Sequence, residues 1–111
     1  MYLVSIGALR PRGFLSLLRV VRLSSRALKA ARVSPGCVSA SVFRAGGQYF
    51  ALSVWDGPAQ MQAYARGPVH GPIMRNNRAL LASFKSVSYP ADHIPSQAEA
   101  SAHWFAVTAP R

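Results

Sequence analysis

His70 is the residue most suited to acid–base chemistry, because histidine changes charge near neutral pH. It follows Gly67-Pro68-Val69 at the predicted start of a helix, where it could act as a catalytic base, a proton shuttle or a ligand. Met74 and Asn77 follow at about one and two helical turns, so the three side chains share one helix face. Asn77 could orient a substrate carbonyl group there. The alternative is a structural histidine that caps the helix or bonds a backbone carbonyl group.

Trp55 and Tyr64 could form the walls of a pocket for a flat substrate. Trp55 ends an apolar segment, and Tyr64 lies in the helix predicted to follow it. Large aromatic residues are also common in protein cores, where the polar end of the ring finds a hydrogen-bond partner. The residue types alone therefore leave open whether the two rings bind a substrate or belong to the core.

Other kinds of catalytic site have little support in the sequence. The chain has one cysteine, Cys37, and no Cys/His spacing typical of zinc sites, so we expect a small strand residue there and no metal. No glycine-rich phosphate loop occurs. The carboxylates form no pair suited to hydrolysis; they are Asp56, Asp92 and Glu99. A reaction without a cofactor remains compatible, because the substrate itself can supply the reactive carbanion.

The chain carries a large excess of positive charge. Its 13 Lys and Arg residues against 3 Asp and Glu residues give a formal net charge of +10, and Asp56 is the first acidic residue. This balance favours nucleic acid, an anionic lipid or an acidic small molecule as a partner, or else it reflects only a solvated helix face.

The N-terminal segment is rich in Arg and Ser and free of acidic residues, which is typical of a mitochondrial transit peptide. Residues 2–9, however, alternate like a strand, so we assign this segment to the fold. The apolar stretch 14–23 is interrupted by Arg19 and Arg22 and is too short to span a membrane. Since the chain also has a single cysteine, we expect a cytoplasmic location.

Hydrophobic periodicity predicts the order of helices and strands. Apolar residues at every second position indicate strands, and apolar steps of three and four indicate helices. Gly and Pro separate these segments, and the Gly46-Gly47 pair is typical of a hairpin turn. In chain order we expect a strand over 2–9, a helix over 14–32, strands over 37–43 and 49–55, a helix over 58–66, a helical segment over 70–84 and a short strand over 85–89.

The helix over residues 14–32 is predicted to be amphipathic, with a basic stripe beside its apolar face. The stripe consists of Arg19, Arg22, Arg26 and Lys29. The residues expected to face the core are Phe14, Leu17, Leu18, Val21, Leu28 and Ala31. For the next helix we expect Asp56 as the N-cap and Pro58 near the first helical position.

Residues 1–90 are expected to form one domain, followed by a C-terminal tail over residues 91–111. The tail has no clear period, so it could wrap the domain or be partly mobile. Trp104 and Phe105 are expected to dock, because an exposed aromatic pair is unfavourable in water. Two further residues of the tail are expected to be exposed rather than catalytic: His93 and His103.

The element order β-α-β-β-α-β predicts the fold. With right-handed crossovers it gives an α+β, ferredoxin-like domain, in which a four-stranded antiparallel sheet carries both helices on one face. The strand over 49–55 has large apolar groups on both faces, so the second face must be covered as well. We expect the sheet of a second copy there, which makes the protein a homodimer of the dimeric α/β barrel type.

Three neighbouring segments carry a resemblance to a known family. They are Phe50–Asp56, Met61–Tyr64 and Gly67–Met74. Together with the element order, they resemble the antibiotic-biosynthesis-monooxygenase-like superfamily, and more narrowly its bacterial branch related to spheroidene monooxygenase. In that branch a strand ends in Trp and an acidic residue, and a Gly-x-x-His turn opens a helix. The resemblance covers roughly residues 2–90.

The resemblance implies a homodimer with sheets packed face to face, and a pocket between sheet and helices in each subunit. Members of the superfamily include cofactor-free oxygenases of polycyclic aromatics and haem-degrading enzymes. The haem-degrading members have an axial His at the position of Met74 and an Asn at that of Ser5 or Ile6, so these departures weaken a haem-degrading role. His70 matches the histidine of the narrower branch.

These observations lead to one function hypothesis. We expect a monooxygenase-like protein that acts on or binds a hydrophobic or aromatic small molecule and needs no cofactor. The expected site residues are His70 as the catalytic residue and, for the substrate, Trp55, Tyr64, Met74 and Asn77. The alternatives are a haem-binding protein and a non-catalytic basic interaction module. No specific nucleic acid is expected, because the strand over 49–55 lacks the aromatic motif of RNA-recognition domains.

Overall fold

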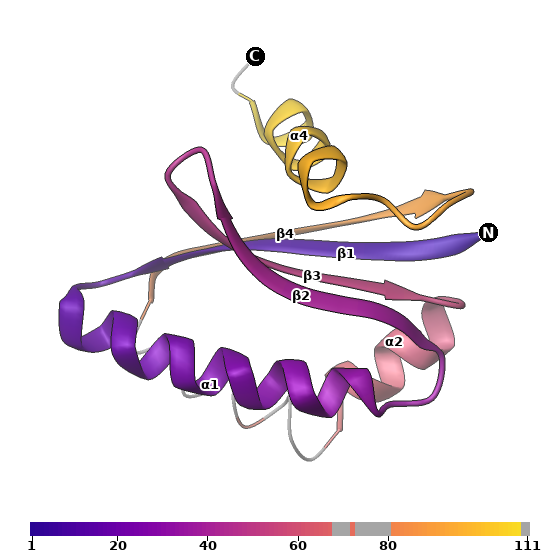
Figure 1. The fold of residues 1–111 in the computed structure, drawn as a ribbon, viewed down its shortest axis with the longest axis horizontal. Coiled ribbons are helices and arrows are strands. Elements are labelled where there is room, and N and C mark those ends of the chain that lie inside the picture. Colours follow the sequence, from indigo (N-terminus) through magenta and orange to yellow (C-terminus); the bar gives the residue numbers. More distant parts are fainter. Residues whose placement is uncertain (68–71, 73–80, 110–111) are drawn as a thin grey trace.

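The four strands form one antiparallel sheet in the order β2-β3-β1-β4, so β3 and β1 lie in its centre. The computed structural model describes residues 1–67, 72 and 81–109. The strands are β1 (Tyr2–Pro11), β2 (Cys37–Ala45), β3 (Gln48–Trp55) and β4 (Leu81–Ala91), and the helices are α1 (Phe14–Arg32), α2 (Pro58–Ala65) and α4 (Gln97–Thr108). The predicted ferredoxin-like α+β fold is confirmed. Figure 1 shows α1 and α2 on one side of the sheet and α4 on the other.

The two faces of the sheet carry side chains of different size. In β1, Ser5 and Gly7 point toward α1 and α2, whereas Val4 and Ile6 point to the opposite face and are fully buried. This alternation follows from the period of two in a strand. The large apolar side chains at the centre of the sheet therefore build the main core on the side of α4. On the side of α1 and α2 the central positions are small, and large side chains such as Leu9 and Trp55 lie around them.

Helix α4 covers the sheet face opposite α1 and α2, on which the sequence predicted no helix (Figure 1). Ala100 and Trp104 of α4 are buried in the core cluster of β1 and β3. The Trp104 indole donates a hydrogen bond from Nε1 to the Lys85 carbonyl oxygen at 3.1 Å and contacts Phe50 edge-on, with ring centroids 5.3 Å apart. The prediction that this face is bare was wrong, because the chain supplies a helix of its own to cover it.

The start of α4 carries a capping box. The Ser96 hydroxyl accepts a hydrogen bond from the Glu99 backbone N–H, and a Glu99 carboxylate oxygen accepts one from the Ser96 backbone N–H, both at 3.1 Å. This reciprocal pair satisfies two backbone donors that a helix start leaves free. The Ser-x-x-Glu spacing was visible in the sequence and marks a helix in the segment that showed no apolar period.

Helix α1 has the predicted bounds, and its predicted core face is correct in part. Ala31 is buried and Leu17 and Leu28 are half-buried, as expected. Phe14, Leu18 and Val21 are exposed instead, and Val20 is buried in their place. Apolar residues occupy much of the circumference of the first two turns, so the period alone does not select the buried side. The four residues of the predicted basic stripe are all exposed: Arg19, Arg22, Arg26 and Lys29.

Three local predictions also need correction. The N-cap of α2 is Gly57 rather than Asp56. The helical segment predicted over 70–84 is wrong for its last residues, because β4 already begins at Leu81 and pairs with β1 along its whole length. His103, predicted to be exposed, is half-buried and stacks on the Tyr89 ring at 3.8 Å, because α4 packs on the sheet.

The hairpin between β2 and β3 forms as predicted. Gly46 and Gly47 have φ angles of 55° and 76°, the left-handed region that a type I′ turn requires at both central positions. The Phe105 ring of α4 lies against Gly46, where a Cβ atom would come within 2.7 Å of it. Glycine at position 46 thus serves both the turn and the docking of α4.

Removing the Trp104 side chain should detach α4 from the sheet. We expect Trp104→Ala to lower the free energy of unfolding by about 3–5 kcal/mol, because it removes a buried ring from the core. Trp104→Phe should cost less, since it keeps most of the ring but loses the bond to Lys85. Urea unfolding measures both values. Val107→Ala, at a position 57% exposed on the same helix, is the control and should change stability by less than about 0.5 kcal/mol.

His93 links the loop before α4 to the first turn of that helix. Its Nδ1 lies 2.7 Å from Asp92 Oδ1 and its Nε2 lies 2.8 Å from Glu99 Oε2. Both ring nitrogens can donate only in the imidazolium form. The hydrogen bonds to Asp92 and Glu99 therefore raise the pKa of His93, and the bond to His93 lowers the pKa of each carboxylate.

This contribution to stability should be complete below the ordinary histidine pKa of 6.5 and disappear as the pH rises through the higher pKa of folded His93. Urea midpoints at about pH 6 and about pH 9 should therefore differ more for the natural chain than for His93→Gln. High salt should reduce the difference, because all three side chains are exposed. An equal pH dependence of the two proteins would contradict this role of His93.

Candidate functional site

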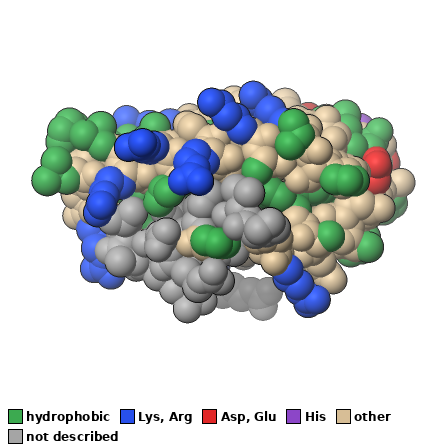
Figure 2. Space-filling view, turned by 90° about the horizontal axis from the view of Figure 1, so that it is seen from below, with side chains coloured by type: hydrophobic (Ala, Val, Ile, Leu, Met, Phe, Trp, Pro, Cys, Tyr) green, Lys and Arg blue, Asp and Glu red, His purple; other side chains and the backbone are tan. Residues whose placement is uncertain are grey.

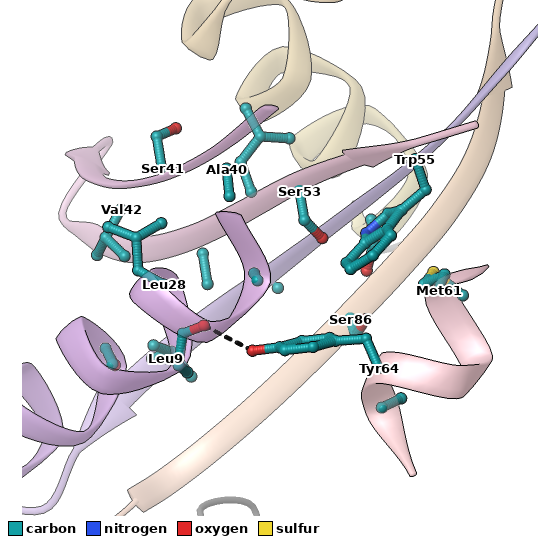
Figure 3. A pocket seen from close by; sticks show the side chains of 18 of the residues that line it. Leu9, Leu28, Ala40, Ser41, Val42, Ser53, Trp55, Met61, Tyr64 and Ser86 are labelled. Atoms are coloured by element: carbon teal, nitrogen blue, oxygen red, sulfur yellow. Dashed lines mark hydrogen bonds between the residues drawn. The ribbon is translucent and has the colours of Figure 1, made fainter. Parts of the chain in front are cut away.

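A cavity of about 320 Å³ lies between the sheet and the helices α1 and α2 (Figure 3). Its size is at the lower end of the range of about 300–1,000 Å³ that is usual for ligand pockets. The floor is the face of the sheet with small side chains, among them Gly7 and Ala51, and Ala27 and Leu28 of α1 lie opposite. The cavity therefore exists because this face does not fill the space beneath the helices.

A row of serine hydroxyl groups crosses the floor of the cavity. Ser5 of β1 is paired in register with Ser53 of β3 on one side and with Ser88 of β4 on the other, and all three residues line the cavity. Within the described residues, the hydroxyl groups of Ser5 and Ser53 have no hydrogen-bond partner in the protein. A few polar groups in an otherwise apolar pocket can fix the orientation of a ligand.

Part of the cavity lining is exposed at β4, one of the two edge strands of the sheet. Phe84 and Ser88 of β4 line the cavity and are also exposed. The Phe84 ring lies directly over Gly7, where a Cβ atom would come within 2.9 Å of the ring. The absence of a side chain at position 7 therefore allows the Phe84 ring to lie close to the floor at this edge of the sheet.

Trp55 closes one end of the cavity. Its side chain is fully buried, and within the described part of the chain its Nε1 has no hydrogen-bond acceptor. Burying such a donor without a partner costs about 1–3 kcal/mol. Neighbouring side chains cover the nitrogen, so it is not open to the cavity.

Tyr64 stacks beside Trp55 and ties α2 to α1. The two ring centroids are 5.3 Å apart, and the Tyr64 hydroxyl donates a hydrogen bond to the Ala27 carbonyl oxygen at 2.7 Å (Figure 3). Burial, with a smaller effect of Cys37, raises the pKa of Tyr64 to about 12. Tyr64 is thus a neutral wall residue at physiological pH rather than a base.

The structure brings together two of the five predicted site residues, Trp55 and Tyr64, on one wall of the cavity. The other three lie outside the described residues: His70, Met74 and Asn77. Sequence reasoning missed the serine row, although the alternation of residues 2–9 already placed Ser5 and Gly7 on one face. Of the two positions compared with the Asn of haem-degrading members, Ser5 lines the cavity and Ile6 lies in the core on the opposite face.

Cys37 begins β2, as predicted for a strand residue, and is half-buried. Burial is the main effect that raises the pKa of its thiol, so it stays protonated and is a poor nucleophile. Among residues 1–67, 72 and 81–109, no three His, Cys, Asp or Glu side chains are grouped to hold a metal ion. No helix in the same part of the chain is long and apolar enough to cross a membrane.

No protein-family model and no curated protein matches the chain. Solved structures do match. Rv0793 from Mycobacterium tuberculosis has a TM-score of 0.78 at 14% identity, over 86% of this chain and 100% of that one. SnoaB, a cofactor-independent oxygenase from Streptomyces nogalater, has a TM-score of 0.71 at 16% identity, over 84% of this chain and 95% of that one.

A proposed antibiotic biosynthesis monooxygenase from Deinococcus radiodurans has a TM-score of 0.73 at 16% identity, over 86% of this chain and 97% of that one. The chain shares the fold of antibiotic biosynthesis monooxygenases. At sequence identities of 14% and 16%, this similarity shows a shared fold and not a shared activity. It does not confirm the narrower branch related to spheroidene monooxygenase.

Loss of the Tyr64 hydroxyl should weaken the packing of α2 on α1. We expect Tyr64→Phe to lower the free energy of unfolding by about 1 kcal/mol at neutral pH, because the Ala27 carbonyl group loses a buried donor. The control is Tyr49→Phe, whose hydroxyl has no hydrogen bond within the described residues. Urea unfolding of both variants measures the difference. Equal stability of the two variants would contradict the role of this hydrogen bond.

Proposed function

We propose that the chain binds a small aromatic molecule with at least one oxygen substituent in the cavity between the sheet and α1. The observation that carries this proposal is the row of serine hydroxyl groups on the floor of an apolar cavity, which have no hydrogen-bond partner among the residues that the structure describes. The apolar walls suit a hydrocarbon ring, and the hydroxyl groups of Ser5 and Ser53 can bond its oxygen atoms.

The reaction we propose is cofactor-free oxygenation of such a ligand. SnoaB, which has the same fold, is a cofactor-independent oxygenase. With 1-naphthol as a probe, one O2 would be consumed and 1,4-naphthoquinone and one water would form. One oxygen atom becomes the new carbonyl group and the other leaves as water, while the naphthol supplies the four electrons that reduce O2. A base must accept the phenolic proton, and we propose His70 for this role.

We also propose roles for two residues after Tyr64 in the chain, and an assembly of two copies. Met74 and Asn77 are proposed to contact the substrate beside His70, and the protein is proposed to be cytoplasmic and homodimeric. Because α4 covers the centre of the second sheet face, a second copy would have to contact α4 itself or the uncovered rim of that face. This differs from direct packing of one bare sheet on another.

Binding of 1-naphthol should depend on the serine row. We expect Ser5→Ala combined with Ser53→Ala to weaken the binding of 1-naphthol by about tenfold, because each lost hydrogen bond is worth about 0.5–1.5 kcal/mol. Naphthalene, which has no oxygen, should bind both proteins equally. Isothermal titration calorimetry measures the four dissociation constants. Ser83→Ala, an exposed serine of β4 outside the cavity lining, is the matched control and should bind like the natural chain.

Equal loss of both ligands in the double variant would contradict recognition of the oxygen atom by the serines. Absence of binding of 1-naphthol to the natural chain would contradict the proposed ligand class.

Turnover tests the catalytic part separately. We expect the natural chain to consume O2 with 1-naphthol and to form the quinone, and His70→Ala to slow this reaction at least about a hundredfold, the usual contribution of a catalytic base. Naphthol binding to His70→Ala should change little. An oxygen electrode and quinone absorbance give the rates. Tight binding without O2 consumption would show a binding protein rather than an oxygenase.

A further inference from the structure

The outer side of α1 exposes large apolar side chains over its first two turns. Phe14 and Leu15 are 73% and 77% exposed, and Leu18 and Val21 are each at least half exposed. The inner side of the same helix packs on the sheet through Val20 and Ala31. A contiguous group of exposed apolar side chains is unfavourable in water and is typical of an interaction surface.

Basic side chains lie beside this apolar group and continue along the helix. Arg19, Arg22, Arg26 and Lys29 are all exposed on α1. Figure 2 shows this side of the molecule, with hydrophobic side chains gathered at the end where α1 begins and Lys and Arg side chains beside them. Two of the three acidic residues in the chain, Asp92 and Glu99, bond His93 at the start of α4, on the opposite side of the sheet. The outer side of α1 is therefore strongly positive.

We propose that this side of α1 docks on the surface of an anionic phospholipid bilayer. An amphipathic helix with Phe and Leu beside Lys and Arg can lie in the plane of the membrane surface, with its apolar side chains among the headgroups. Each Lys or Arg near the surface adds attraction to anionic lipids. A nucleic acid would account for the arginines but not for Phe14 and Leu15, because its backbone presents phosphates rather than an apolar layer.

Docking in this orientation would hold the cavity close to the lipid. Ser24, Ala27 and Leu28, on the inner side of α1, line the cavity, so only the thickness of one helix separates it from the outer side. That thickness is about 10 Å. An apolar aromatic ligand dissolved in the bilayer would then reach the cavity over a short path. Membrane docking would use only the exposed side chains of α1, so it does not depend on the proposed reaction.

The test is flotation of the full chain with lipid vesicles. We expect binding to vesicles of phosphatidylcholine with one quarter phosphatidylglycerol, and little binding to pure phosphatidylcholine. Arg19→Gln combined with Arg22→Gln should weaken binding to the anionic vesicles by about fivefold for each charge removed. Phe14→Ser combined with Leu15→Ser should weaken it by about tenfold, since binding also scales with the apolar area inserted. About 1 M salt should reduce the electrostatic part.

Matched controls change the same residue types elsewhere on the surface. Arg44→Gln on β2 and Val107→Ser on α4 replace an exposed arginine and an exposed apolar residue away from α1, and both should bind like the natural chain. Circular dichroism shows whether each variant is folded. Equal binding to neutral and anionic vesicles would overturn the proposal. Unchanged vesicle binding after Phe14→Ser combined with Leu15→Ser would also overturn it. If a single-stranded RNA then competed with the vesicles for the protein, the positive surface would be a nucleic-acid site instead.

Discussion

The difference in side-chain size between the two faces at the centre of the sheet is the constraint on which the rest of this structure depends. On one face, Val4, Ile6 and Phe50 fill the space under α4 and leave no exposed surface of their own. On the other face, Ser5 and Gly7 leave a cavity beneath α1 that the helix cannot fill. One face thus carries the largest core cluster, and the other combines two smaller clusters with the cavity.

Much of the fold could be predicted from the sequence because strand and helix periods are local properties. The alternation in β1 and β3 and the glycine pair of the hairpin depend only on neighbouring residues, and they led to the correct sheet. The buried side of α1 could be predicted only in part: Leu28 and Ala31 pack as expected, but the residues of the first two turns do not. Val20 and Val21 are equivalent by residue type, and only the position of the helix on the sheet decides which is buried.

The C-terminal helix was missed for a physical reason of a different kind. Apolar residues surround α4 on all sides, since Ala102, Phe105 and Ala106 are exposed while Ala100 and Trp104 are buried. Such a helix has no amphipathic period to detect. Its capping box was the only local signal, and the prediction of a partner's sheet followed from overlooking it. Sequence position alone also could not show that Ser5 and Ser53 become neighbours, because their pairing is long-range.

The glycine at position 7 has a consequence for the shape of the cavity. It contributes only backbone to the floor, and it determines how near the Phe84 ring can lie to that floor at the edge of β4. An alanine there would push the ring outward by some tenths of an ångström and alter the cavity at this edge without touching the serines. The width of the cavity at this edge and the row of serine hydroxyl groups on its floor are therefore set by different residues, so a substitution at position 7 can alter the first without altering the second.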